Sequence, residues 1–167
     1  MLPAAAPAAM QGEFQEAVAH FESGHFQACY ERLEPLVAQA PYDLRLNFYL
    51  GRCATEVGRY NAATLAYERA LLARPDYVRG KLELARVHFE RGRYDLARPL
   101  FQEVRSHEQT PRQVREKIDR ILASMERGQE PGTLKALLGV GIKYDGNVNN
   151  SPTQTEVAIP GTPLVTT

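Results

Sequence analysis

The chain lacks several features that would indicate a particular class of protein. It has no tryptophan and only two cysteines among 167 residues, which are too few for a disulfide framework. Its 20 basic and 20 acidic residues cancel, so no net charge attracts nucleic acid or anionic lipid. No apolar run reaches about 18 residues, and the sequence therefore predicts no transmembrane helix.

The two cysteines, Cys29 and Cys53, both fall in segments with helical periodicity. Free buried thiols are one interpretation of this placement. A disulfide between neighbouring helices is the other, and the sequence leaves both open.

Catalytic motifs are absent as well. We find no glycine-rich phosphate loop, nucleophile elbow or cysteine pair. The four histidines, His20, His25, His88 and His107, do not have the spacing of metal ligands. We therefore expect neither enzyme activity nor a metal or cofactor.

One segment resembles a calcium-binding loop in the spacing of its polar residues. Asp145, Asn147, Asn149 and Glu156 follow the ligand spacing of an EF-hand. The glycine that such a loop requires is replaced by Asn150, so we do not expect calcium binding.

What the sequence does contain is a pattern that recurs three times with a period of 34 residues. Each unit has a small residue, then a glycine, an aromatic residue, a second small residue and a bulky apolar residue. The matched positions are Ala17, Gly51 and Ala85; Gly24, Gly58 and Gly92; Phe26, Tyr60 and Tyr94; Cys29, Ala63 and Ala97; and Leu33, Tyr67 and Phe101. A fixed period of this length is typical of stacked repeat folds, and 34 residues is the tetratricopeptide length.

Each unit predicts two helices joined at its glycine, which can adopt the left-handed conformation that ends a helix. The first helices are expected over about 12–23, 44–57 and 78–91, and the second helices over about 26–39, 60–73 and 94–107. Pro41 and Pro75 stop second helices, since proline has no N–H to continue one. Pro35 and Pro99 lie inside second helices and should bend them.

The segments on either side of the repeats differ in composition. Residues 12–111 form the three repeats, and residues 1–11, rich in alanine and proline, are expected to be an unstructured leader or the remnant of an export signal. An apolar stripe over 112–128 predicts a capping helix that covers the end of the stack. The stripe consists of Val114, Ile118, Ile121, Leu122 and Met125.

Beyond residue 128 the period changes from about 3.6 to 2 residues. A linker at 129–133 is followed over 134–144 by alternating apolar and small or cationic residues, which predict one β-strand that ends at Tyr144. The length and alternation match the first strand of an outer-membrane β-barrel. This chain would then be a fragment or a truncated product, with 145–167 a long polar loop. A soluble edge strand or hairpin packed on the repeats is the alternative.

The expected fold is thus all-α, a tetratricopeptide-type helical solenoid of three helix pairs and a capping helix, followed by one strand. Residues 10–109 resemble tetratricopeptide repeats. The second unit carries the resemblance best, at Leu50, Gly51, Ala54, Gly58, Tyr60, Ala63, Tyr67, Ala70 and Pro75.

The repeats together with residues 141–152, Gly-Ile-Lys-Tyr-Asp-Gly-Asn-Val-Asn-Asn-Ser-Pro, resemble the surface lipoprotein assembly modifier (Slam) family. In that family a periplasmic repeat domain precedes an outer-membrane barrel. The resemblance implies a role in delivering lipoproteins or related substrates across the outer membrane of a Gram-negative bacterium. The repeat half would receive or hold the substrate.

Tetratricopeptide arrays usually hold ligands on the inner faces of their first helices. By repeat position, this groove would be lined by Phe14 and Val18; by Arg45, Phe48 and Arg52; and by Arg79, Leu82, Arg86 and Phe89. Arginine among aromatic residues suits an extended peptide or an acidic segment. Arrays that clamp a C-terminal carboxylate have lysine and asparagine at these places, so that ligand is not expected. A solvated face with scattered arginines is the alternative.

We expect a periplasmic, protein-binding repeat domain of an outer-membrane translocation protein. Its partner would be a lipoprotein or an extended peptide, not nucleic acid, and the missing barrel would connect it to the outer membrane. Two alternatives remain: a structural scaffold that assembles an envelope or exopolysaccharide export complex through the convex surface, and a cytoplasmic tetratricopeptide adaptor.

Overall fold

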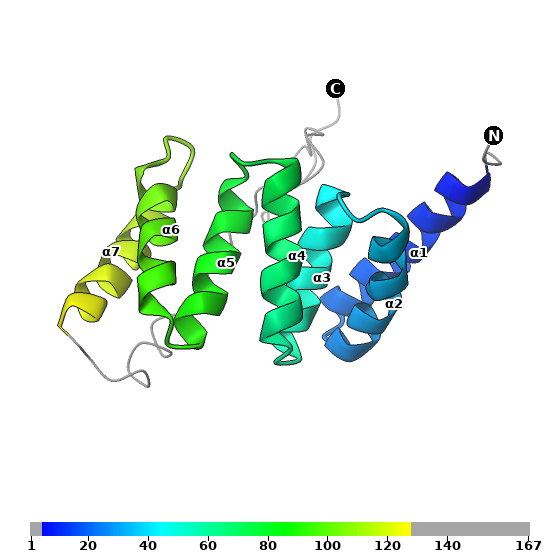
Figure 1. Cartoon of the computed structure of the whole chain (residues 1–167), viewed down its shortest axis with the longest axis horizontal. Coiled ribbons are helices and arrows are strands. Elements are labelled where there is room, and N and C mark those ends of the chain that lie inside the picture. Colours follow the sequence, from blue (N-terminus) through cyan, green and yellow to red (C-terminus); the bar gives the residue numbers. More distant parts are fainter. Residues whose placement is uncertain (1–4, 128–167) are drawn as a thin grey trace, which may run out of the picture.

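The computed structural model of the chain describes residues 5–127, and these form an array of α-helices (Figure 1). The helices are α1 (Ala5–Glu22), α2 (Phe26–Gln39), α3 (Leu44–Glu56), α4 (Tyr60–Ala73), α5 (Val78–Glu90), α6 (Tyr94–Ser106) and α7 (Arg112–Glu126). None of these helices is long and apolar enough to cross a membrane. The linker, strand and loop expected over 129–167 lie outside the described residues.

The helices form three antiparallel pairs that stack side by side, with α7 packed against α6 (Figure 1). Helix α3 contacts both α1 and α5, whereas α2, α4 and α6 make no such contacts with one another within residues 5–127. The first helices therefore lie closer together and form the inner, concave face. The second helices form the outer, convex face.

The glycine turns are as predicted. Gly24, Gly58 and Gly92 have φ angles of 80°, 77° and 72°, in the left-handed region that glycine adopts without a steric penalty. In each turn the N–H that follows the glycine donates to a carbonyl of the preceding helix; the bond from Arg59 to Ala54 is 2.8 Å long. Every unit therefore reverses the chain by the same local mechanism.

The observed helix boundaries lie within two residues of the predicted ones, except for the start of the first helix. Helix α1 begins at Ala5, so residues 5–11 are helical, in a segment for which the sequence analysis expected an unstructured leader or the remnant of an export signal. Helices α2 and α6 continue through Pro35 and Pro99. Both prolines are exposed to solvent.

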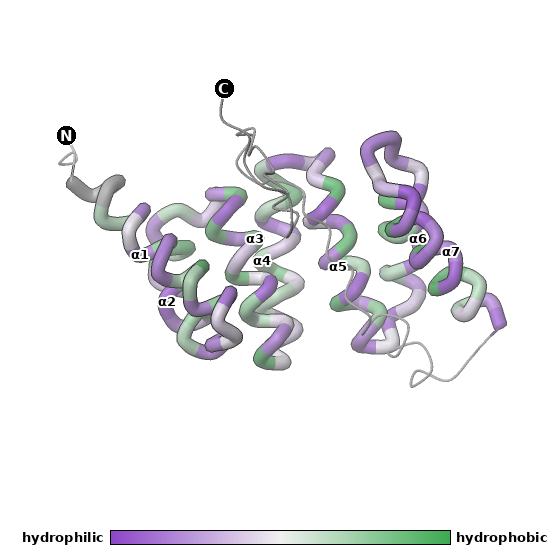
Figure 2. The backbone as a smooth tube through the Cα atoms, turned by 180° about the vertical axis from the view of Figure 1, so that it is seen from behind, coloured by the Kyte–Doolittle hydropathy of each residue, from purple (hydrophilic) through white to green (hydrophobic). Residues whose placement is uncertain are grey.

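The buried side chains form two clusters that share α5 as a common wall. The first fills the space among α1 to α4 and includes Leu84 and Val87 of α5. The second lies among α5, α6 and α7 and includes Leu82 and Phe89. Figure 2, which shows the opposite side, makes the alternation of apolar and polar residues along each helix visible. Each helix pair thus depends on its neighbour for a complete core.

Cys29 and Cys53 form a disulfide that connects α2 to α3, with their Cα atoms 6.0 Å apart. Both side chains are fully buried in the first core. The interpretation as free thiols is therefore wrong. The bond joins the first repeat unit to the second.

Candidate functional site

The concave face is organised in rows, because residues 34 positions apart occupy equivalent places on α1, α3 and α5. Gln11, Arg45 and Arg79 form one row, and Arg45 Nη2 donates to Gln11 Oε1 at 3.3 Å. A second row contains Val18, Arg52 and Arg86. The side chains of Val18 and of all four arginines are half-buried. The structure thus brings together the polar residues that the sequence placed on this face.

Four apolar residues of the predicted groove are more deeply buried than the arginines. Phe14, Phe48, Leu82 and Phe89 are buried in the two cores, and Phe14 and Phe48 lie beneath arginines. A ligand on this face would therefore meet the arginines first. The aromatic side chains act as a support for them.

Three of the arginines lie over aromatic rings. The guanidinium carbon of Arg52 is 4.0 Å from the centre of the Phe21 ring, and that of Arg45 is 5.3 Å from the Phe14 ring. Arg79 lies 4.9 Å from the Phe48 ring. Such cation–π contacts orient a guanidinium group without using its N–H donors.

Phe21 was missed by the sequence analysis, although its spacing could have identified it. It follows Val18 by three residues on α1, which places both on one side of that helix. In the third unit the equivalent position is Phe89, which the analysis did include.

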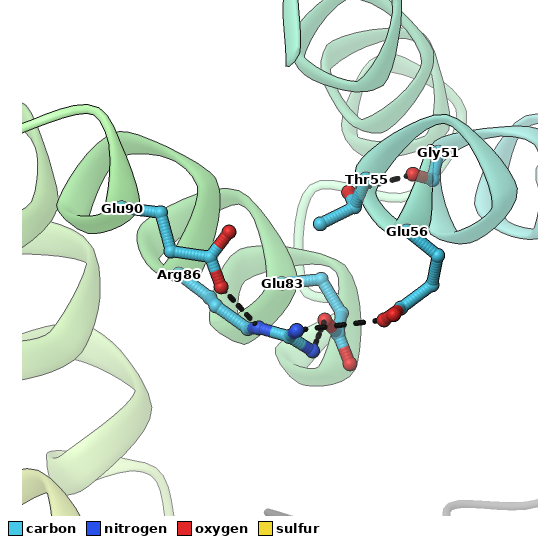
Figure 3. Close-up of polar contacts among 6 residues, drawn as sticks. All are labelled: Gly51, Thr55, Glu56, Glu83, Arg86 and Glu90. Atoms are coloured by element: carbon cyan, nitrogen blue, oxygen red, sulfur yellow. Dashed lines mark hydrogen bonds and ion pairs between the residues drawn. The ribbon is translucent and has the colours of Figure 1, made fainter. Parts of the chain in front are cut away.

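Arg86 has a different environment from the other arginines (Figure 3). Its Nε is 2.8 Å from Glu90 Oε1, its Nη2 is 3.4 Å from Glu56 Oε1, and its Nη1 is 3.8 Å from Glu83 Oε2. Burial alone would lower the pKa of Arg86, but these three carboxylates raise it above its usual range. The charge of Arg86 is therefore balanced within the protein.

Glu83 lies near the centre of this face with only 13% of its side chain exposed. Burial raises the pKa of its carboxyl group, while Arg86, Arg52 and Arg79 act in the opposite direction. The sequence analysis did not select Glu83. It occupies the row between the two arginine rows, equivalent to Gln15 and Tyr49.

The resulting charge distribution is uneven along the face. Glu56, Glu83 and Glu90 gather around Arg86 at the third unit. Towards the first unit, Arg52 forms neither a hydrogen bond nor an ion pair with any residue that the structure describes. The end of the face formed by α1 and α3 therefore offers cationic donors. Residues 5–127 contain no group of three or more histidine, cysteine or acidic side chains that could hold a metal ion.

Comparison with known proteins agrees with this architecture. The tetratricopeptide repeat family model matches residues 54–118, which extend from the end of α3 into α7. No curated protein sequence matches the chain.

Several solved structures share the fold. The type III secretion chaperone SycD of Yersinia enterocolitica, in complex with a peptide of the translocator YopD, is 15% identical, with a TM-score of 0.68 over 77% of this chain and 100% of that chain. PcrH in complex with the chaperone-binding region of PopD is 19% identical, with a TM-score of 0.66 over 77% of this chain and 100% of that one. PcrH from Pseudomonas aeruginosa is 18% identical, with a TM-score of 0.63 over 75% and 96%. At these identities the similarity establishes the fold, and residues 5–127 therefore form a tetratricopeptide-type helical solenoid.

Proposed function

We propose that this chain is a non-catalytic, protein-binding repeat domain whose concave face holds an extended segment of a partner protein. The observation that carries the proposal is Arg52, which lies on the Phe21 ring with its N–H donors unused by the residues that the structure describes. A guanidinium that is already oriented loses less freedom when it binds a carbonyl or carboxylate.

The neighbouring residues support the same kind of ligand. Arg45 and Arg79 flank Arg52 across the face, and both lie over aromatic rings. An extended peptide offers a backbone carbonyl at every residue, and acidic side chains would pair with the cationic end near α1 and α3. SycD was solved with a peptide of the translocator YopD, and PcrH with the chaperone-binding region of PopD, so two proteins of similar fold bind segments of other proteins.

A binding experiment with two charge reversals tests the proposal. The Arg52→Glu variant should capture far less protein from a periplasmic extract than the unchanged chain, because it replaces the oriented donors by a carboxylate. Arg98→Glu is the matched control, because it makes the same change of charge on the outer helix α6 instead of the concave face. The Arg98 side chain is half-exposed, and its ion pair with Glu126 is long, at 3.7 Å. Equal capture by all three proteins would contradict a role for the concave face.

We further propose that the repeats work in the periplasm, as part of an outer-membrane translocation protein that delivers surface lipoproteins or related substrates. Two observations support this. The Cys29–Cys53 disulfide favours an oxidising compartment, since cytosolic thiols are kept reduced. The Slam-like stretch at 141–152 suggests the first strand of a barrel.

Cell fractionation combined with thiol labelling tests the location. Periplasmic extract should contain the protein, and the two cysteines should resist maleimide labelling until a reductant is added. Recovery in the cytosol with both thiols reactive would contradict the periplasmic assignment. It would leave the peptide-binding proposal intact, because that proposal depends only on the concave face.

A further inference from the structure

The convex surface carries a groove that the proposed function does not use. It has a volume of about 450 Å³ and lies between α2 and α4. Ala38 of α2 and Ala62 and Ala66 of α4 line it, with Glu34 on the α2 wall and Leu65 and Arg69 on the α4 wall. The groove can exist because the backbones of α2 and α4 do not approach each other closely, with no Cα atoms of the two helices within 8 Å.

Comparison of the repeat units explains why this groove is open. The three alanines are replaced 34 residues later by leucines, namely Leu72, Leu96 and Leu100. An alanine leaves the volume that a leucine side chain would fill. Of the three leucines, Leu100 packs against both cores, so its equivalent, Ala66, leaves space open between α2 and α4.

Protruding apolar side chains stand beside the groove. Leu65 is 47% exposed and Leu72 is 71% exposed, although both are large and hydrophobic. They are seven residues apart on α4 and therefore lie on one side of that helix. One surface thus combines apolar projections with an apolar groove, which is typical of an interaction site.

The groove also carries one charge of each sign. Glu34 Oε1 accepts a hydrogen bond of 2.9 Å from the Tyr30 hydroxyl on the α2 wall. Arg69 stands on the α4 wall and forms no ion pair with any residue from 5 to 127. The two walls are therefore complementary in charge, but the charges are not paired with each other.

We propose that this surface binds a second copy of the chain in a symmetric dimer. A twofold interface requires one patch that complements itself, and this patch offers projections, a groove and opposite charges. An axis along the groove sets the α2 wall of one copy against the α4 wall of the other. Glu34 then faces Arg69 of the partner subunit.

The repeat spacing gives the dimer its register. Residues 38 and 72 are 34 positions apart and occupy the same level of α2 and α4. The same axis therefore places Leu72 of the partner subunit opposite Ala38, where the small side chain leaves room for it. The charged and the apolar contacts require the same orientation of the two copies.

Sedimentation equilibrium of the full chain over a range of concentrations tests the dimer. The wild-type protein should dimerise reversibly, and Leu72→Glu should be monomeric. Leu96→Glu is the matched control, since Leu96 is also an exposed leucine on an outer helix, and it should leave the dimer constant unchanged. A wild-type monomer at every concentration would overturn the proposal and favour a different protein as the occupant.

Charge reversal tests the orientation. Glu34→Arg and Arg69→Glu should each weaken dimerisation by about tenfold or more, because each places like charges opposite one another. The double variant restores opposite charges and should return the dimer constant to near the wild-type value. If the double variant is as weak as the single variants, the proposed register is wrong. Circular dichroism melting of each variant separates lost dimerisation from lost folding.

Discussion

Gly51 of α3 lies directly against the ring of Tyr67 of α4, so closely that a Cβ atom on Gly51 would be 2.6 Å from Tyr67 Cε1. Tyr67 is fully buried in the first core. The distance between the two helices of the second unit is therefore set by the absence of a side chain at position 51.

The Gly51→Ala variant should lower the free energy of unfolding by about 1–3 kcal/mol, because the new methyl group overpacks the core. Gly12→Ala is the matched control. Gly12 also lies within a helix, and a Cβ atom there would meet nothing within 4 Å. That variant should gain up to about 1 kcal/mol, because alanine favours a helix. Urea denaturation of both variants checks the prediction, and similar stability changes would contradict it.

The disulfide should make a large contribution to stability. It closes a loop between residues 24 positions apart, and restricting the unfolded chain in this way contributes about 3 kcal/mol. The Cys29→Ala/Cys53→Ala variant should therefore unfold at lower urea than the oxidised wild-type protein. Added reductant should shift only the wild-type curve. A wild-type curve that does not respond to reductant would show that the bond is absent or does not stabilise the fold.

Replacement of Glu83 by glutamine should be tolerated at neutral pH. Because the folded protein raises the pKa of this carboxyl group, folding disfavours its ionised form, and stability falls as the pH rises above the ordinary value of 4.5. Glu83→Gln removes this unfavourable charge, although it also removes the 3.8 Å contact with Arg86. At pH 7 the variant should be as stable as the wild-type protein or more stable, by up to about 1 kcal/mol.

The difference between the two proteins should shrink as the pH approaches 4, where the glutamate is also neutral. Urea denaturation at both pH values checks this. A loss of stability at pH 7 would show that the ion pair outweighs the burial of the charge.

His88 should make the protein less stable in mild acid. This side chain is buried, and burial, assisted by Arg93, lowers its pKa below the ordinary value of 6.5. The unfolded chain therefore binds a proton at a higher pH than the folded protein, and stability falls as the pH drops through 6.5. His88→Gln should lose less stability between pH 7.5 and 5.5 than the wild-type protein does, by up to about 1 kcal/mol. Parallel pH profiles would contradict the assignment to His88.

Most of the fold follows from local signals in the sequence. The glycine of each turn, the small residues between helices and the apolar spacing together predict α2 to α7 within one or two residues. Helix α1 is the exception. Alanine favours a helix, but Pro3 and Pro7 made the first segment resemble a leader, and the helix extends back to Ala5.

The candidate site was harder to predict, because repeat position gives the face of a helix and not the depth of a side chain. Phe48 and Arg79 both belong to the concave side, yet Phe48 is buried and Arg79 covers its ring. Long arginine side chains can fold over apolar neighbours and keep their charged ends near water. Which of two residues on one face lies above the other depends on the packing of several helices.

The position of the disulfide within the first core has a consequence for how the array deforms. The bond ties α2 to α3, whereas the second core, around Phe101 and Ile118, contains no covalent cross-link among the residues that the structure describes. Rigidity should therefore decrease along the array, from the cross-linked units towards α7. A long ligand would meet a firm surface at the arginine-rich end and an adjustable one at the other. The arginine-rich end would then determine most of the affinity, and the adjustable end near α7 would determine which ligand sequences are tolerated.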